Sequence, residues 1–131
     1  MKRKQKYNAS KTTIDGIIFD SRKEAKRYLF LKDLERSGDI SNLHRQVTYE
    51  LLPAVTEQVI IRLKTKLKSA IRTLQRPITY RADFVYCRDG KVITEDVKAS
   101  PKMIPADFKI KEKLFFYKYK YRITKIYQYD Q

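Results

Sequence analysis

Two hydrophobic periods alternate along the chain, and together they predict a domain that mixes helices with strands. From Ser21 onward, apolar side chains recur every three or four residues as far as Leu34, which is the spacing of one helix face. Ser21 and Glu24 match the S-x-x-E capping box, and Gly38 is suited to end the helix. The pattern therefore predicts an amphipathic helix over residues 21–37.

Segments rich in β-branched and aromatic residues predict the strands. The strongest signal is ITYRADFVYC at 78–87, which a glycine-containing turn joins to a partner strand at 91–98. Shorter extended segments are expected at 14–20, 40–43, 46–52 and 122–129. The order of helix, strands, helix and strand predicts an α/β (α+β) fold in which helices flank a mixed central β-sheet.

The segment between the early and late strands fits two structures. Residues 57–74 carry an apolar stripe at helical spacing, which favours a helix as far as Lys66. Residues 64–68 also alternate like a basic strand, so both structures stay open there. The sequence alone therefore leaves this segment only partly assigned.

A second helix is expected near the end of the chain. After a proline-containing loop at 99–106, Asp107 is a suitable N-cap for a helix over 107–118. At this length we expect one domain, residues 14–131, preceded by a basic flexible arm at residues 1–13.

Net charge narrows the class of partner. The 131 residues include 30 Lys and Arg against 15 Asp and Glu, a formal net charge of +15. A surplus of this size on a small domain favours a polyanion, and nucleic acid leads. A membrane surface is a weaker alternative, because no amphipathic segment pairs a basic face with aromatic anchors.

Residue counts exclude several other classes. No run approaches the roughly 18–20 apolar residues of a membrane span, and no apolar region follows the basic start, so no secretory signal is expected. Cys87 and His44 are the only residues of their types, which excludes an internal disulfide and Cys-rich zinc sites. We expect a cytoplasmic protein with no membrane partner and no small-molecule cofactor, in which Cys87 and His44 serve packing or surface roles.

Two aspartates and a lysine are the strongest candidates for chemistry. Asp83 lies in an apolar strand, where a carboxylate is costly to bury unless it is paired or binds a cation. Asp96 and Lys98 share one face of the next strand, and the tight turn brings the two strands side by side. Mg²⁺ often binds one or two carboxylates, and Lys98 could orient or deprotonate the attacking water. A surface Asp–Lys ion pair is the alternative.

This arrangement resembles the PD-(D/E)xK nuclease superfamily, which has the restriction-endonuclease-like fold. Ala82 precedes Asp83 where the motif name has proline, and Asp96-Val97-Lys98 matches (D/E)-x-K. The superfamily also places a glutamate on a helix before the core sheet, and Glu24 in FDSRKEA is the matching residue.

The chain also resembles a family of small phage endonucleases similar to Holliday-junction resolvases, in three blocks at 6–25, 80–84 and 95–98; residues 55–76 match least. The resemblance implies a metal-dependent endonuclease that hydrolyses DNA, selective for branched structures and used in phage recombination or packaging. It implies Mg²⁺, replaceable by Mn²⁺, and a catalytic set of Glu24, Asp83, Asp96 and Lys98, of which the first three bind metal. Symmetric cuts in a junction would need a homodimer, which the sequence permits.

The remaining candidates are less specific. Contacts with the nucleic-acid backbone are expected from Lys109, Lys111, Lys113, Lys11 and Arg22. Glu95 should point away from the site into an ion pair or solvent, unless a β-bulge turns it inward, and Gln46 either lines the site or is an ordinary strand residue. The alternative function is a non-catalytic nucleic-acid-binding protein that keeps the fold; a phage structural or packaging accessory is a third.

Overall fold

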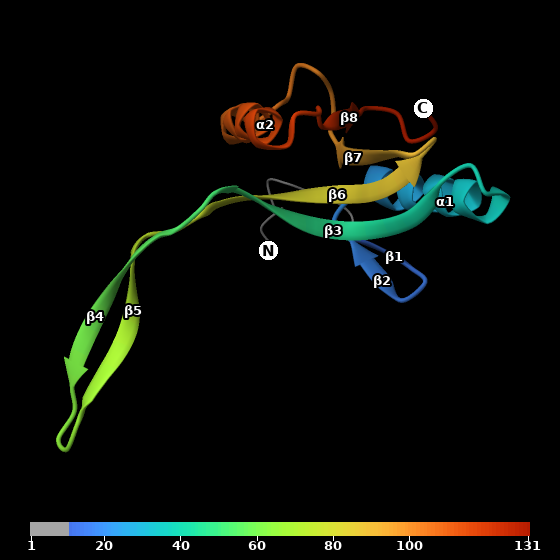
Figure 1. Ribbon diagram of the computed structural model, residues 1–131. Helices are drawn as coiled ribbons and strands as arrows, with labels where there is room; N and C mark the ends of the chain where they lie inside the picture. Colours follow the sequence, from blue (N-terminus) through green and yellow to red (C-terminus); the bar gives the residue numbers. More distant parts are fainter. Residues whose placement is uncertain (1–10) are drawn as a thin grey trace, which may run out of the picture.

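The computed structural model describes residues 11–131, in which a two-stranded arm projects from a mixed sheet (Figure 1). In chain order the elements of this part are β1 (Thr12–Ile14), β2 (Ile17–Phe19), α1 (Arg22–Ser37), β3 (Ser41–Leu52), β4 (Val55–Arg62), β5 (Leu67–Gln75), β6 (Ile78–Arg88), β7 (Lys91–Val97), α2 (Ala106–Tyr119) and β8 (Thr124–Ile126). Most of the basic arm expected at 1–13 lies outside the described residues, and β1 already begins at Thr12.

The central sheet has the strand order β3-β6-β7-β8, with the pair β7–β8 parallel and the others antiparallel. Successive residues of β7 point to opposite faces. Glu95 reaches Arg27 of α1, whereas the hydroxyl of Thr94 shares a hydrogen bond with that of Tyr121, just after α2. The two helices therefore cover opposite faces, and the expected α+β architecture of a mixed sheet flanked by helices is confirmed.

Each helix has its own hydrophobic core. The α1 core comprises Phe19, Ala25, Tyr28, Leu31, Ile40, Phe84 and Tyr86. The α2 core comprises Leu51, Tyr80, Ala82, Phe108, Phe115 and Ile123. Strand β6 contributes buried residues to both cores and so connects the two halves of the domain.

The first helix begins and ends as the sequence predicts. The Ser21 side chain accepts a hydrogen bond from the Glu24 backbone N–H at 3.1 Å, and Gly38 has a φ of 84°, the left-handed conformation that glycine adopts most easily. The second helix differs at its start, because Pro105 rather than Asp107 is the N-cap and no side chain caps it.

The helix favoured from residue 57 to Lys66 is wrong: the segment is part of the β4–β5 hairpin, which projects away from both helices (Figure 1), and of the residues left open at 64–68, Leu67 and Lys68 begin a strand. Its apolar residues do recur at helical spacing, but many are β-branched and so favour a strand. No neighbouring layer is present to bury a helical stripe, since Ile60 and Ile71 are 75% and 72% exposed.

Several strand boundaries also differ from the prediction, and the segment expected at 14–20 is divided between β1 and β2 by a turn. The segments expected at 40–43 and 46–52 form the single strand β3, in which Asn42 and Gln46 adopt positive φ angles of 56° and 53°. The last strand is confined to Thr124–Ile126 instead of 122–129. Within residues 11–131, no helix is both long and apolar enough to cross a bilayer.

Candidate active site

Asp83 lies where β6 separates from β7. The pairing of these strands runs from Arg88 opposite Lys91 to Phe84 opposite Glu95, and Asp83 is the next residue of β6. Its Oδ2 instead accepts a hydrogen bond from the backbone N–H of Val97 at 2.8 Å. The carboxylate is thereby fixed beside the Asp96–Lys98 segment, as the sequence predicts.

The regular alternation of β6 is interrupted at the same point. Tyr80 packs on Phe108 of α2, whereas Phe84 belongs to the α1 core, although residues four apart in a regular strand share a face. Gln46 lies opposite Asp83, between the cross-strand pairs of β3 and β6, and has a φ of 53°. This irregularity lets side chains from both faces approach Asp83.

Asp96 is held on both of its oxygens. Lys98 Nζ lies 2.9 Å from Oδ1, and the Tyr80 hydroxyl donates to Oδ2 at 2.7 Å. Burial, followed by the charge of Asp96, raises the pKa of the Tyr80 hydroxyl, so it remains a donor. The Lys98 ammonium also lies 3.7 Å from the ring centroid of Phe108, a cation–π contact that fixes its position.

Glu24 reaches the same region from the first turn of α1. Its Oε1 accepts a hydrogen bond from Gln46 Nε2 at 3.0 Å and lies 3.8 Å from a terminal guanidinium nitrogen of Arg45. Gln46 therefore lines the site through Glu24. Within residues 11–131, Arg45 Nε is a buried side-chain nitrogen without a hydrogen-bond partner.

Nearby negative charges make it harder to ionise two of the three carboxylates, Asp83 and Glu24. Burial, followed by the charge of Asp96, raises the pKa of Asp83 to about 7; Glu24 adds to this rise, and the Val97 N–H and Lys98 oppose it. Burial is also the first cause of the raised pKa of Glu24, which Arg45 opposes and Asp20 and Asp96 increase. This concentration of negative charge is the kind that a divalent cation relieves.

The donor set fits a hard cation with few protein ligands. In the described part of the chain, no group of three or more His, Cys, Asp and Glu side chains is arranged to hold a metal ion. Mg²⁺ keeps several waters and commonly takes only one or two carboxylates, which Asp83 and Asp96 can provide. Glu24, whose Oε1 is held by Gln46, is the third carboxylate near this pair.

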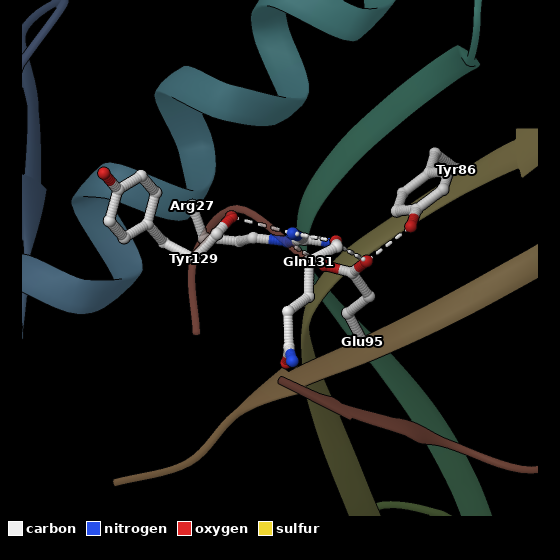
Figure 2. Close-up of polar contacts among 5 residues, drawn as sticks. All are labelled: Arg27, Tyr86, Glu95, Tyr129 and Gln131. Carbon is white, nitrogen blue, oxygen red and sulfur yellow. Dashed lines mark hydrogen bonds and ion pairs between the residues drawn. The ribbon is translucent and has the colours of Figure 1, made fainter. Parts of the chain in front are cut away.

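Glu95 lies apart from this site, in a buried ion pair (Figure 2). Its oxygens accept from Arg27 Nε at 2.8 Å and from a terminal nitrogen of the same guanidinium at 2.5 Å, and Tyr86 donates a hydrogen bond to it. Arg27 also donates to the main-chain oxygens of Tyr129 and Gln131. Of the alternatives for Glu95, the structure has the ion pair on the opposite face.

A small pocket adjoins the carboxylates at the start of α1. It has a volume of about 260 Å³ and is lined by Ser21, Lys23, Val97, Lys98 and Ala99. Lys23 Nζ donates to the main-chain oxygen of Ala99 at 3.0 Å, which places a second ammonium beside Lys98. Sequence reasoning missed Lys23, Arg45 and Tyr80, although the first two are direct neighbours of Glu24 and Gln46.

The predicted backbone-contacting residues are only partly gathered. Lys109 and Lys113 are exposed and one helical turn apart on α2, whereas Lys111 is half-buried on another side of that helix. Arg22 is the exposed first residue of α1, beside the pocket, and Lys11 is also exposed. His44 is exposed and Cys87 half-buried, in keeping with the non-catalytic roles expected for them.

Comparison with known proteins finds a matching family model, and its description gives no function. A family model described as "Protein of unknown function (DUF1064)" matches residues 4–130. No curated protein and no solved structure matches the chain.

Proposed function

Because the chain belongs to the DUF1064 family, whose function is unknown, we propose its activity from the site: it is a metal-dependent endonuclease that hydrolyses DNA phosphodiester bonds. The observation that carries the proposal is the convergence of Asp83, Asp96 and Lys98 where β6 and β7 separate. In a protein that only binds nucleic acid, two carboxylates next to the phosphates would weaken the binding by charge repulsion. A hydrolase, in contrast, needs them to hold a cation.

The residues take distinct roles in this proposal. Asp83 and Asp96 would hold Mg²⁺, or Mn²⁺ in its place, and the bound ion supplies an activated water and charge for the pentacoordinate phosphate. Tyr80 and Lys98 fix Asp96, and the Lys98 ammonium orients the attacking water and stabilises the negative charge that develops on the phosphate. Glu24 would be an auxiliary ligand that reaches the ion directly or through water, and the charge of Arg45 partly offsets that of Glu24.

The order of the elements supports placing the core among restriction-endonuclease-like folds. A helix with an acidic first turn precedes the sheet, and the two aspartates lie on adjacent antiparallel strands, as in the PD-(D/E)xK arrangement. The same likeness suggests that the substrate is branched DNA, such as a Holliday junction, and that a homodimer makes the paired cuts. It also suggests that the protein acts in phage recombination or packaging, in the host cytoplasm.

A cleavage assay tests the proposal. The full chain is incubated with linear, single-stranded and four-way-junction DNA in Mg²⁺, in Mn²⁺ and with a chelator, and cleavage is expected only with the metals. Asp83→Asn should abolish cleavage and preserve or tighten binding. Asp33→Asn, the same change at an exposed α1 residue paired with Arg36, is the matched control and should cleave normally.

The second candidate is the non-catalytic nucleic-acid-binding protein, which the net charge of +15 favours. Tight, salt-dependent binding without cleavage of any DNA or RNA under these conditions would establish it and overturn the nuclease proposal.

A further inference from the structure

The β4–β5 hairpin is an arm that takes no part in either hydrophobic core (Figure 1). We propose that it binds duplex DNA, lying along the major groove over about one helical turn of the duplex beside the cut. The inference rests on the proposed function for the identity of the substrate, and it deepens that function by assigning a second contact on the duplex beside the cut.

Charge is the first argument for this partner. Residues 55–76 contain six basic residues, all exposed, namely Arg62, Lys64, Lys66, Lys68, Arg72 and Arg76. Glu57 is the only acidic residue in this range, and it is paired with Arg72. A surface of this composition is complementary to a polyanion.

Exposed apolar side chains on one face of the arm are the second argument. Ile60, Leu67 and Ile71 share this face, because Ile60 pairs with Ser69, Arg62 with Leu67, and Gln58 with Ile71. These three side chains are 75%, 64% and 72% exposed. An isolated two-stranded ribbon is at best marginally stable, so a face of this kind needs a partner.

The dimensions of a ribbon fit a groove of B-form DNA. Paired strands lie about 4.7–4.9 Å apart, and the major groove, about 12 Å wide, admits a two-stranded ribbon. The eleven residue steps from Leu52 to the tip at Leu63 give the arm a length of roughly 36 Å, close to one helical turn of about 34–36 Å. In the groove, basic side chains at the tip can reach phosphates while apolar ones meet thymine methyl groups.

A second copy of the chain is a poorer partner for this face. Two arms packed together through this face would bring like charges into contact, since Arg62 lies on the same face directly across from Leu67. Double-stranded RNA is also a poorer partner, because the deep, narrow major groove of the A-form excludes side chains.

The first test compares two triple variants in the Asp83→Asn background, which binds without cutting. The arm triple neutralises the arm tip and combines Lys64→Gln, Lys66→Gln and Lys68→Gln. The control triple makes the same charge change at exposed sites away from the arm and combines Lys26→Gln, Arg36→Gln and Lys91→Gln. The arm triple should lower the salt slope by about 0.9 for each phosphate that is no longer neutralised, by roughly two or three in all, and weaken binding to a 30-base-pair duplex at least tenfold. The control triple should change both quantities much less. Equal effects of the two triples would overturn the inference.

The second test removes the arm. Because Val55 lies opposite Gln75, an Asn-Gly turn can replace residues 56–74 and close the shortened hairpin. The intact arm should make affinity rise as the duplex flanking a junction is lengthened from about 6 to about 16 base pairs, across one helical turn. The deletion should abolish this rise, and a rise that persists contradicts the proposal.

Sedimentation and cleavage separate the remaining outcomes. If either arm variant changes the oligomeric state of the free protein, the arm is a subunit interface and the inference is wrong. If the arm variants weaken duplex binding but the wild-type chain never cleaves, DNA binding by the arm is supported and the nuclease proposal is wrong. If wild type cleaves and the arm variants bind and cleave equally well, only the arm inference falls.

Discussion

The Asp83 carboxylate accepts a hydrogen bond from the backbone N–H of Val97, the residue between Asp96 and Lys98. A single side chain thus closes the gap that opens where β6 and β7 separate. Asp83→Asn can keep this bond through its amide oxygen, whereas Asp83→Ala leaves the Val97 N–H without it. We expect Asp83→Ala to be less stable than Asp83→Asn by about 1–3 kcal/mol in urea denaturation, while both are inactive. Equal stability would show that the bond contributes little.

The raised pKa of Asp83 predicts how stability depends on pH. An unfolded aspartate titrates near 3.9, so the folded protein holds this proton more tightly, and the stabilisation is complete below about pH 4 and lost as pH rises through about 7. In metal-free buffer the free energy of unfolding should therefore fall between these values, by at most about 4 kcal/mol for this group. Asp83→Asn should leave only the smaller decline due to Glu24. Added Mg²⁺ should also reduce the decline; an unchanged profile in Asp83→Asn contradicts the assignment.

Lys98 is expected to act on the reaction rather than on substrate binding. Lys98→Gln removes the ammonium that lies 2.9 Å from Asp96 and should lower the cleavage rate by about 10²–10⁴-fold. Affinity for junction DNA, measured in the Asp83→Asn background, should change only a few-fold. Lys102→Gln, in the exposed loop after Lys98, makes the same chemical change and should cleave like wild type. A similar loss of rate in both variants would assign Lys98 a general electrostatic effect.

Tyr80 is a positioning residue for Asp96. Tyr80→Phe keeps the ring in the α2 core but removes the 2.7 Å hydrogen bond, so the Mg²⁺ concentration for half-maximal cleavage should rise by about 10–100-fold, with a smaller change in maximal rate. Tyr49→Phe deletes a hydroxyl that contacts Thr94 in the same region and should not alter the metal requirement. If Tyr80→Phe only lowers thermal stability, the role is structural.

The Arg27–Glu95 pair should matter for folding and not for chemistry. Glu95→Gln leaves the buried Arg27 guanidinium without its counter-charge and should cost about 3–5 kcal/mol. Asp33→Asn breaks the exposed pair with Arg36 and should cost no more than about 1 kcal/mol. Below its unfolding temperature, Glu95→Gln should cleave within a few-fold of wild type. A complete loss of cleavage by the folded variant would instead place Glu95 in the reaction.

Local sequence signals predict an element correctly where the residues that form the signal also make the contacts that define that element. Ser21 and Gly38 delimit α1 because each satisfies a need of a helix end, an N-terminal N–H acceptor and a left-handed residue. The β6–β7 hairpin followed from its aromatic and β-branched content and its turn. The period of two along β7 was enough to separate Asp96 from Glu95.

Residues 55–76 show where such signals fail. A spacing of three or four between apolar residues indicates a helix only if a neighbouring layer buries the stripe, and sequence does not show whether that layer exists. In the arm it does not, and the β-branched residues Val55, Val59, Ile60, Ile61 and Ile71 then favour the extended form.

The unpredicted members of the site share a different cause. Tyr80 and Arg45 come near Asp96 and Glu24 through tertiary packing, and the irregularity at Gln46 and Asp83 that permits this has no clear sequence marker. Lys23 has no marker in the sequence either, because its acceptor, the main-chain oxygen of Ala99, lies 76 residues away along the chain.

The alternating environments of Glu95 and Asp96 also constrain how β7 can pair. A slip by one residue would turn each carboxylate toward the other face. Glu95 would lose Arg27, and the shorter Asp96 side chain would have to replace it against a guanidinium placed for a longer acid. Both acids would then be buried without adequate partners, so the two adjacent charges penalise misregistered forms and help to specify a single alignment of the sheet.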